Sequence, residues 1–167
     1  MEPVNKVRNY AELGVNLQKI VNRLMENNNL VNLLYYQDKD PLSQPHLTKE
    51  EKQQNIFQKR ILIIPKMNPQ ELAESTISVT CIKSTTLGAN NEFLELTICV
   101  EVFVPITQWI IKDSNLRPYA ILGEVQRSLD GKIINGLGRM SGGDFEYNFG
   151  SNEMTHFIQI FTITNYD

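Results

Sequence analysis

The alternation of apolar and polar residues is clearest between Phe93 and Val104, in the stretch FLELTICVEVFV. A period of two places alternate side chains on one face of a β-strand. The apolar face comprises Leu94, Leu96, Ile98, Val100, Val102 and Val104. Residues 76–83 alternate in the same way, and the intervening segment STTLGANNE is polar and contains a glycine. We therefore expect an antiparallel hairpin with a long loop between its strands.

Two segments show the spacing of three and four residues that is typical of amphipathic helices. The first begins at a capping box, Asn9–Glu12, and its apolar stripe comprises Tyr10, Leu13, Leu17, Ile20, Val21 and Leu24. The run Asn27–Asn29 is expected to kink or end it, because asparagine competes for backbone hydrogen bonds. The second helix starts at Arg117–Pro118 and stops before Gly131. Both helices are predicted to cover the apolar face of the sheet.

A second hairpin is predicted near the carboxyl end. Phe145, Tyr147 and Phe149 alternate with polar residues, a turn follows, and Met154–Thr164 forms a long final strand. The segments 135–138 and 141–144 are expected to be turns because they are rich in glycine. A short buried strand is expected at residues 60–65. The fold class is therefore α+β: one domain, residues 1–167, with a mainly antiparallel sheet built from two hairpins and two helices packed on one face.

Residues 37–56 form an unusually long connection for a small domain. Prolines at positions 41 and 45 disfavour helix before them, and Thr48–Glu51 is a second capping box that begins a short polar helix. One helical turn is expected at Asn68–Glu71. Two interpretations of the 37–56 segment remain open, a contact arm and a mobile surface loop.

Composition and charge narrow the possible functions. The chain is 41% hydrophobic and 21% charged, with a net charge of −3. A protein that binds nucleic acid by neutralising phosphates needs a basic face, so this class is disfavoured, although DNA could pass such a surface without binding. Cys81 and Cys99 lie in apolar strands and are expected to act as small hydrophobic residues. We expect no signal peptide, no membrane segment and an aqueous, reducing compartment.

No catalytic, cofactor-binding or metal-ligating residue is predicted, and the protein is not expected to be an enzyme. His46 and His156 are far apart in the sequence and lack the spacing of a metal site. The glycines between positions 131 and 138 lack the strand and helix context of a phosphate-binding loop. Asp144 and Glu146 could share a strand face, and a solvated sheet surface is the favoured interpretation.

Aromatic and apolar residues in loops are the remaining candidates for function. Tyrosine and tryptophan are common in protein interfaces because they bury a large area at a small entropic cost. The candidate subunit or partner contacts are Tyr35, Tyr36, Leu42, Trp109, Tyr119, Glu124, Arg127 and Tyr166. The alternative, that the aromatic residues cover the ends of a small core, remains open.

The run from Thr97 to Met140 resembles bacteriophage structural proteins of the head-to-tail region, and most closely the tail terminator and tail-completion type. The shared features are a long strand ending near Trp109, the Arg117–Pro118 dipeptide that opens a helix, a small-residue turn and a closing hairpin over 145–165. The segments 37–54 and 66–75 have no clear counterpart in that pattern.

The resemblance implies a virion structural protein, assembled in the host cytoplasm and located in the tail or neck. It implies a homo-oligomeric ring, usually of six copies, that caps the tail tube and joins it to the head connector while DNA passes through without specific binding. Alternatives are a head-completion or neck adaptor on the portal ring and a tube-like protein. A small soluble adaptor or an enzyme is a remote alternative.

Overall fold

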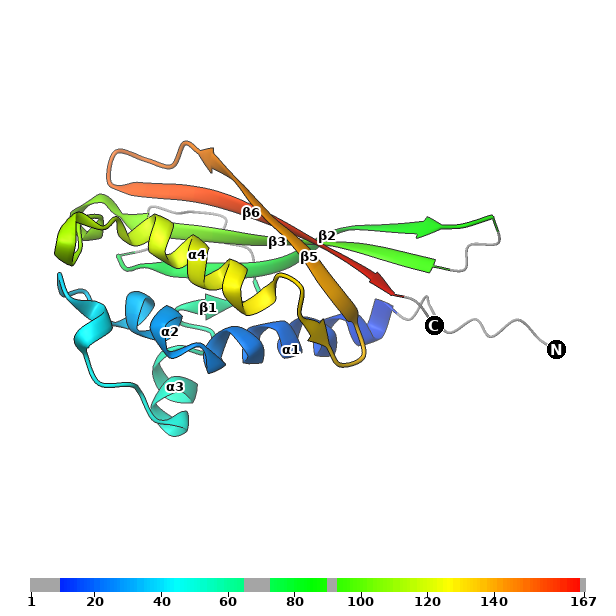
Figure 1. The fold of residues 1–167 in the computed structure, drawn as a ribbon, viewed down its shortest axis with the longest axis horizontal. Helices are drawn as coiled ribbons and strands as arrows, with labels where there is room; N and C mark the ends of the chain where they lie inside the picture. Colours follow the sequence, from blue (N-terminus) through cyan, green and yellow to red (C-terminus); the bar gives the residue numbers. More distant parts are fainter. Residues whose placement is uncertain (1–9, 65–72, 90–92, 166–167) are drawn as a thin grey trace.

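The computed structural model describes residues 10–64, 73–89 and 93–165 and has an α+β fold, as predicted (Figure 1). The helices are α1 (Leu13–Glu26), α2 (Asn28–Tyr35), α3 (Lys49–Asn55) and α4 (Arg117–Leu129). The strands are β1 (Ile61–Leu62), β2 (Thr76–Leu87), β3 (Phe93–Pro105), β4 (Ile133–Ile134), β5 (Gly138–Asn148) and β6 (Met154–Asn165).

The strands form one curled, mixed sheet in the order β1-β2-β3-β6-β5-β4. Both predicted hairpins, β2–β3 and β5–β6, are present, and β3 joins them by pairing with β6 along its whole length. The short strand β1 pairs in parallel with β2, and β4 pairs with the start of β5. The sheet is therefore larger than two hairpins, because each outer strand gains a short partner.

The core lies between one face of the sheet and the helices. The six apolar side chains of β3 that share a face are all buried and join one cluster with residues of α1, α2 and α4. α1 and α4 lie along that face in Figure 1. Burying each large aliphatic side chain contributes about 1.5–3 kcal/mol. The alternation seen in the sequence thus marks the face of the sheet that the helices cover, as expected.

The first helix is broken where the asparagine run predicted. α1 ends at Glu26, and the Asn27 side chain accepts a hydrogen bond from the Leu30 backbone N–H at 3.0 Å, which caps α2. The predicted capping box at Asn9 lies outside the described residues. Among the described residues, a 3-10 turn over Tyr10–Glu12 leads into α1. Glu12 occupies the N-cap of α1 without a side-chain capping bond.

The capping box at the start of α3 is confirmed. The Glu51 N–H donates to Thr48 Oγ1 at 3.2 Å, and the Thr48 N–H donates to Glu51 Oε2 at 2.8 Å. Each bond satisfies a backbone donor that the first turn of a helix leaves free. The helical turn expected at Asn68–Glu71 lies outside the described residues.

Two predicted loops are strands instead. Residues 84–87 extend β2, and residues 141–144 lie inside β5. The second error has a physical cause: Gly142 and Gly143 have positive φ angles of 122° and 108° at an irregularity in the pairing of β5 with β6. A Cβ atom on Gly142 would lie 2.7 Å from the Ile160 carbonyl oxygen, so these glycines allow a bulge rather than a chain reversal.

A buried arginine at the start of α4 attaches the end of α2 and the start of the 37–56 segment to α4. The Arg117 side chain is almost wholly inaccessible to solvent. Its guanidinium donates four hydrogen bonds of 2.6 to 2.9 Å to the backbone oxygens of Leu33, Tyr36, Asp38 and Gln108. The first two lie at the carboxyl end of α2, where helix carbonyls lack intrahelical partners and a positive charge is favourable.

A candidate protein interface

Four aromatic side chains gather at the surface where α4 meets β5. Tyr119, Phe145, Tyr147 and Phe149 are 45%, 48%, 47% and 87% exposed, and we call them the aromatic patch. Phe145 and Tyr147 are two residues apart on β5 and therefore share a face, and Tyr119 lies in the first turn of α4 beside them. The Tyr119 and Phe145 ring centres are 6.0 Å apart.

A buried phenylalanine supports the patch from below. Phe157 on β6 is 1% exposed. Its ring centre lies 5.6 Å from that of Tyr119, 6.0 Å from that of Phe145 and 5.0 Å from that of Tyr147. Trp109 lies 6.3 Å from the same ring, and its indole N–H donates to Thr155 Oγ1 at 2.9 Å. The contacts to Phe157 hold the exposed rings in a defined arrangement, which lowers the entropic cost of binding a partner.

The patch adjoins an open edge of the sheet. β4 pairs only with Gly138 and Arg139 of β5, and the Gly142 N–H donates to Asp130 at 3.2 Å. Beyond this point, residues 144–148 have β6 on one side and no strand on the other within the described residues. All five side chains of this segment are exposed, and they include the carboxylates of Asp144 and Glu146. Unpaired strand edges of this kind can accept another chain.

Some of the predicted contact residues belong to this surface and others do not. Tyr119 is part of the aromatic patch, and Trp109 lies partly buried beside it, with their ring centres 6.4 Å apart. Leu42 is exposed on the 37–56 segment. Tyr35 and Tyr36 contact each other edge to face at 5.0 Å, and the Tyr36 hydroxyl donates to the Pro45 carbonyl at 2.8 Å. The two tyrosines therefore also stabilise the turn of the 37–56 segment.

Glu124 and Arg127 have different environments although both lie on the polar side of α4. Arg127 is exposed and forms an ion pair with Glu124. The Glu124 carboxylate is largely buried and accepts a hydrogen bond from Asn27 Nδ2 at 2.9 Å. The same amide nitrogen bonds Ser128 Oγ at 2.9 Å, so Glu124 joins α4 to the start of α2. Tyr166 lies outside the described residues.

Phe145, Tyr147 and Phe149 were absent from the predicted contacts. Their alternation was evident in the sequence and correctly predicted a strand. The missed signal is that three aromatic residues at a period of two end in a glycine turn. A buried strand needs a covering layer, and the two predicted helices are both expected to cover the first hairpin.

The opposite face of the sheet carries a buried polar network. Ser78 Oγ donates to Glu101 Oε2 at 3.0 Å, and His156 Nε2 lies 3.1 Å from Glu101 Oε1. The other imidazole nitrogen lies 3.2 Å from the Asn148 amide, and the ring stacks on Phe103. The hydrogen bond from His156 lowers the pKa of Glu101. Because the carboxylate lies between hydroxyl and imidazole, the histidine is not placed to take the serine proton, as nucleophilic catalysis requires.

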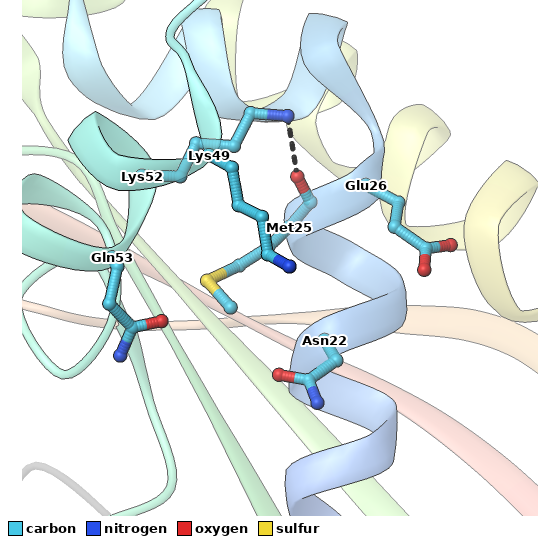
Figure 2. A pocket seen from close by; sticks show the side chains of 6 residues that line it. All are labelled: Asn22, Met25, Glu26, Lys49, Lys52 and Gln53. Carbon is cyan, nitrogen blue, oxygen red and sulfur yellow. Dashed lines mark hydrogen bonds between the residues drawn. The ribbon is translucent and has the colours of Figure 1, made fainter.

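A cleft of about 580 Å³ separates α1 from α3 (Figure 2). Its walls are formed by Asn22, Met25, Glu26, Lys49, Lys52 and Gln53. The Lys52 ammonium donates to the Met25 carbonyl at 2.9 Å and to Asn28 Oδ1 at 2.6 Å, and burial lowers the pKa of Lys52. This lysine therefore attaches α3 to the end of α1, where a cation interacts favourably with the helix carbonyls.

The cysteines occupy opposite faces of the sheet. Cys81 follows Val79 on the helix-covered face, whereas Cys99 alternates with the buried residues of β3 and lies on the other face. Burial raises the pKa of the Cys99 thiol to about 11. In the part of the chain that the structure describes, no three histidine, cysteine or carboxylate side chains cluster as metal ligands. Over the same residues, no helix has both the length and the apolar character needed to cross a membrane.

Comparison with known proteins assigns the chain to a family. No curated protein matches the chain. The YomW family model matches residues 27–163, a span that runs from the cap of α2 to near the end of β6 and contains the aromatic patch. The chain therefore belongs to the YomW family, a phage-derived family of SPbeta-like prophage genes.

Proposed function

We propose that this protein is a structural subunit of the head-to-tail region of a phage particle. In this role it forms a ring, of six copies, that caps the tail tube and joins it to the head connector. The observation that carries the proposal is the aromatic patch beside the unpaired edge of β5. The phage origin of the family supports the same assignment.

The patch has the chemistry of a protein contact. Phe and Tyr are enriched in the buried centres of interfaces, and monomeric proteins seldom expose contiguous apolar groups of this kind. Ile106 and Ile110, close to Trp109 in the sequence, also expose apolar side chains. Asp144 and Glu146 lie on the opposite face of β5 and place charge along the open edge beside the patch. An apolar surface next to charged groups is a common arrangement in specific interfaces.

The proposed role requires neither catalysis nor tight binding to DNA. A net charge of −3 gives the subunit little attraction for a phosphate backbone, so DNA could slide through a ring of such subunits. A virion location and assembly in the host cytoplasm are part of the proposal.

The test uses the full chain mixed with purified tail tubes of the phage that encodes it. Native mass spectrometry and negative-stain imaging should show six copies at one end of each tube. The double variant Tyr147→Ser, Phe149→Ser should stay folded and lose tube binding, since both side chains are largely exposed. Val15→Ser, which removes an exposed apolar side chain from α1, is the matched control and should bind normally.

Other outcomes would change the assignment. A monomer that never associates with tube ends would contradict the proposal. Twelve copies on the portal ring would indicate a neck adaptor, and many stacked copies would indicate a tube subunit.

A further inference from the structure

The sheet has two open edges, one on each side. β1 covers β2 only at Ile77 and Ser78, so residues 80–87 have β3 on one side and no strand on the other within the described residues. Ile82 lies in this segment at an irregularity in the pairing of β2 with β3, and its side chain is 57% exposed. At the opposite side of the sheet, residues 144–148 of β5 are open in the same way. Unpaired backbone N–H and C=O groups along such an open edge can accept another strand.

The strand directions make the two edges compatible. β2 is antiparallel to β3, β3 to β6, and β6 to β5, so β2 and β5 run in opposite directions. A second copy added beside the first in the same orientation would therefore place its β2 antiparallel to β5. An antiparallel junction between β5 of one copy and β2 of the next continues the alternation of strand directions from copy to copy.

The charges on the two edges are opposite and lie on the same face of the sheet. Lys83 is paired with Thr97, which alternates with the helix-facing residues of β3 and so points away from the helices. Glu146 is paired with Ile158, which lies opposite Glu101 on that same outer face. Lys83 and Glu146 are both exposed. In a head-to-tail junction the basic group of one copy would face the acidic edge of the next.

We infer that residues 144–148 of β5 in one copy pair with residues 80–87 of β2 in the next copy, making a sheet that continues from subunit to subunit. The occupant of each open edge is thus a second copy of this chain. Such a contact uses different surfaces on the two partners, and a series of them closes into a ring when the rotation permits. The inference rests on the self-association included in the proposed function and specifies which surfaces carry it.

The test reverses one charge at a time in the full chain. Lys83→Glu and Glu146→Lys should each weaken self-association about tenfold or more, measured by sedimentation velocity, because an attractive cross-strand pair becomes repulsive. A one-to-one mixture of the two variants should recover association, since each junction in an alternating ring is then complementary. Lys49→Glu is a matched charge reversal on α3, outside the sheet, and should associate normally.

Each remaining result has a defined meaning. If Lys83→Glu associates normally while Glu146→Lys does not, the junction joins two β5 edges about a twofold axis, and the inference is wrong. If Lys83→Glu associates more strongly, Lys83 serves to keep the edge unpaired, which also overturns it. A chain that is monomeric at all concentrations overturns the inference as well. If the variants behave as expected but the ring never binds tail tubes, the strand pairing stands and the proposed function fails.

Discussion

Replacing Arg117 tests whether its four hydrogen bonds stabilise the fold. Arg117→Met keeps most of the side-chain volume and removes the guanidinium. The substitution leaves four backbone oxygens without their donor. It also removes the positive charge at the carboxyl end of α2.

The size of the loss follows from where each oxygen lies. The bond to the Leu33 oxygen is buried, so leaving this acceptor unpaired costs about 1–3 kcal/mol. The oxygens of Tyr36, Asp38 and Gln108 are only partly buried, and water can replace each lost bond at a net cost of about 0.5–1.5 kcal/mol. Removing a buried charge recovers part of this, because a charge is costly to desolvate. We expect a net loss of about 3 kcal/mol.

Urea unfolding followed by circular dichroism measures this loss. In thermal unfolding followed by the same signal, the Tm should fall by roughly 6–12 °C for a chain of this size. Arg23→Ala on α1, whose ion pair with Glu26 is exposed on both sides, is the control and should change the free energy of unfolding by less than about 0.5 kcal/mol. A loss below about 1 kcal/mol for Arg117→Met, with an unchanged slope of the free energy of unfolding against urea concentration, would refute the reasoning.

Three further substitutions probe other parts of the fold. Thr48→Ala removes a capping bond of α3 and should cost about 1 kcal/mol in urea unfolding, whereas Thr48→Ser should cost little. Glu101→Gln should make the free energy of unfolding depend less on pH in the acid range. The bond to His156 lowers the pKa of Glu101 in the folded state. The stability that the ionised Glu101 contributes is therefore present at neutral pH and lost as the pH falls below about 4. Equal acid sensitivity in both proteins would contradict this assignment. Gly142→Ala should destabilise by about 2 kcal/mol or more, measured as a lower Tm, because the new methyl group would meet the Ile160 oxygen.

The elements that the sequence predicted well are defined by local chemistry. The strand over β3 follows from its alternation, the start of α4 from Pro118, and the start of α3 from the capping box at Thr48. The order of strands across the sheet depends on contacts between distant segments. Nothing near β6 in the sequence indicates that it lies beside β3 rather than at an edge.

The exposure of individual side chains was harder to predict than the fold, for the same reason. Phe145 and Phe157 are both aromatic residues in neighbouring strands, yet one is 48% exposed and the other 1%. The difference depends on where α4 and the segment around Trp109 cover the hairpin. Glu124 shows the converse case: helical periodicity places it on the polar side of α4, and Asn27 covers it from a distant part of the chain.

The bonds of Arg117 also bear on how this family can diverge in sequence. The hydrogen bonds of the guanidinium go to main-chain oxygens only, so they do not depend on the identity of the side chains at positions 33, 36, 38 and 108. Relatives should retain an arginine in the first turn of α4, whereas the residues that supply the bonded oxygens can change. Methods that infer contacts from paired substitutions would find no partner for it, although it joins two distant parts of the chain.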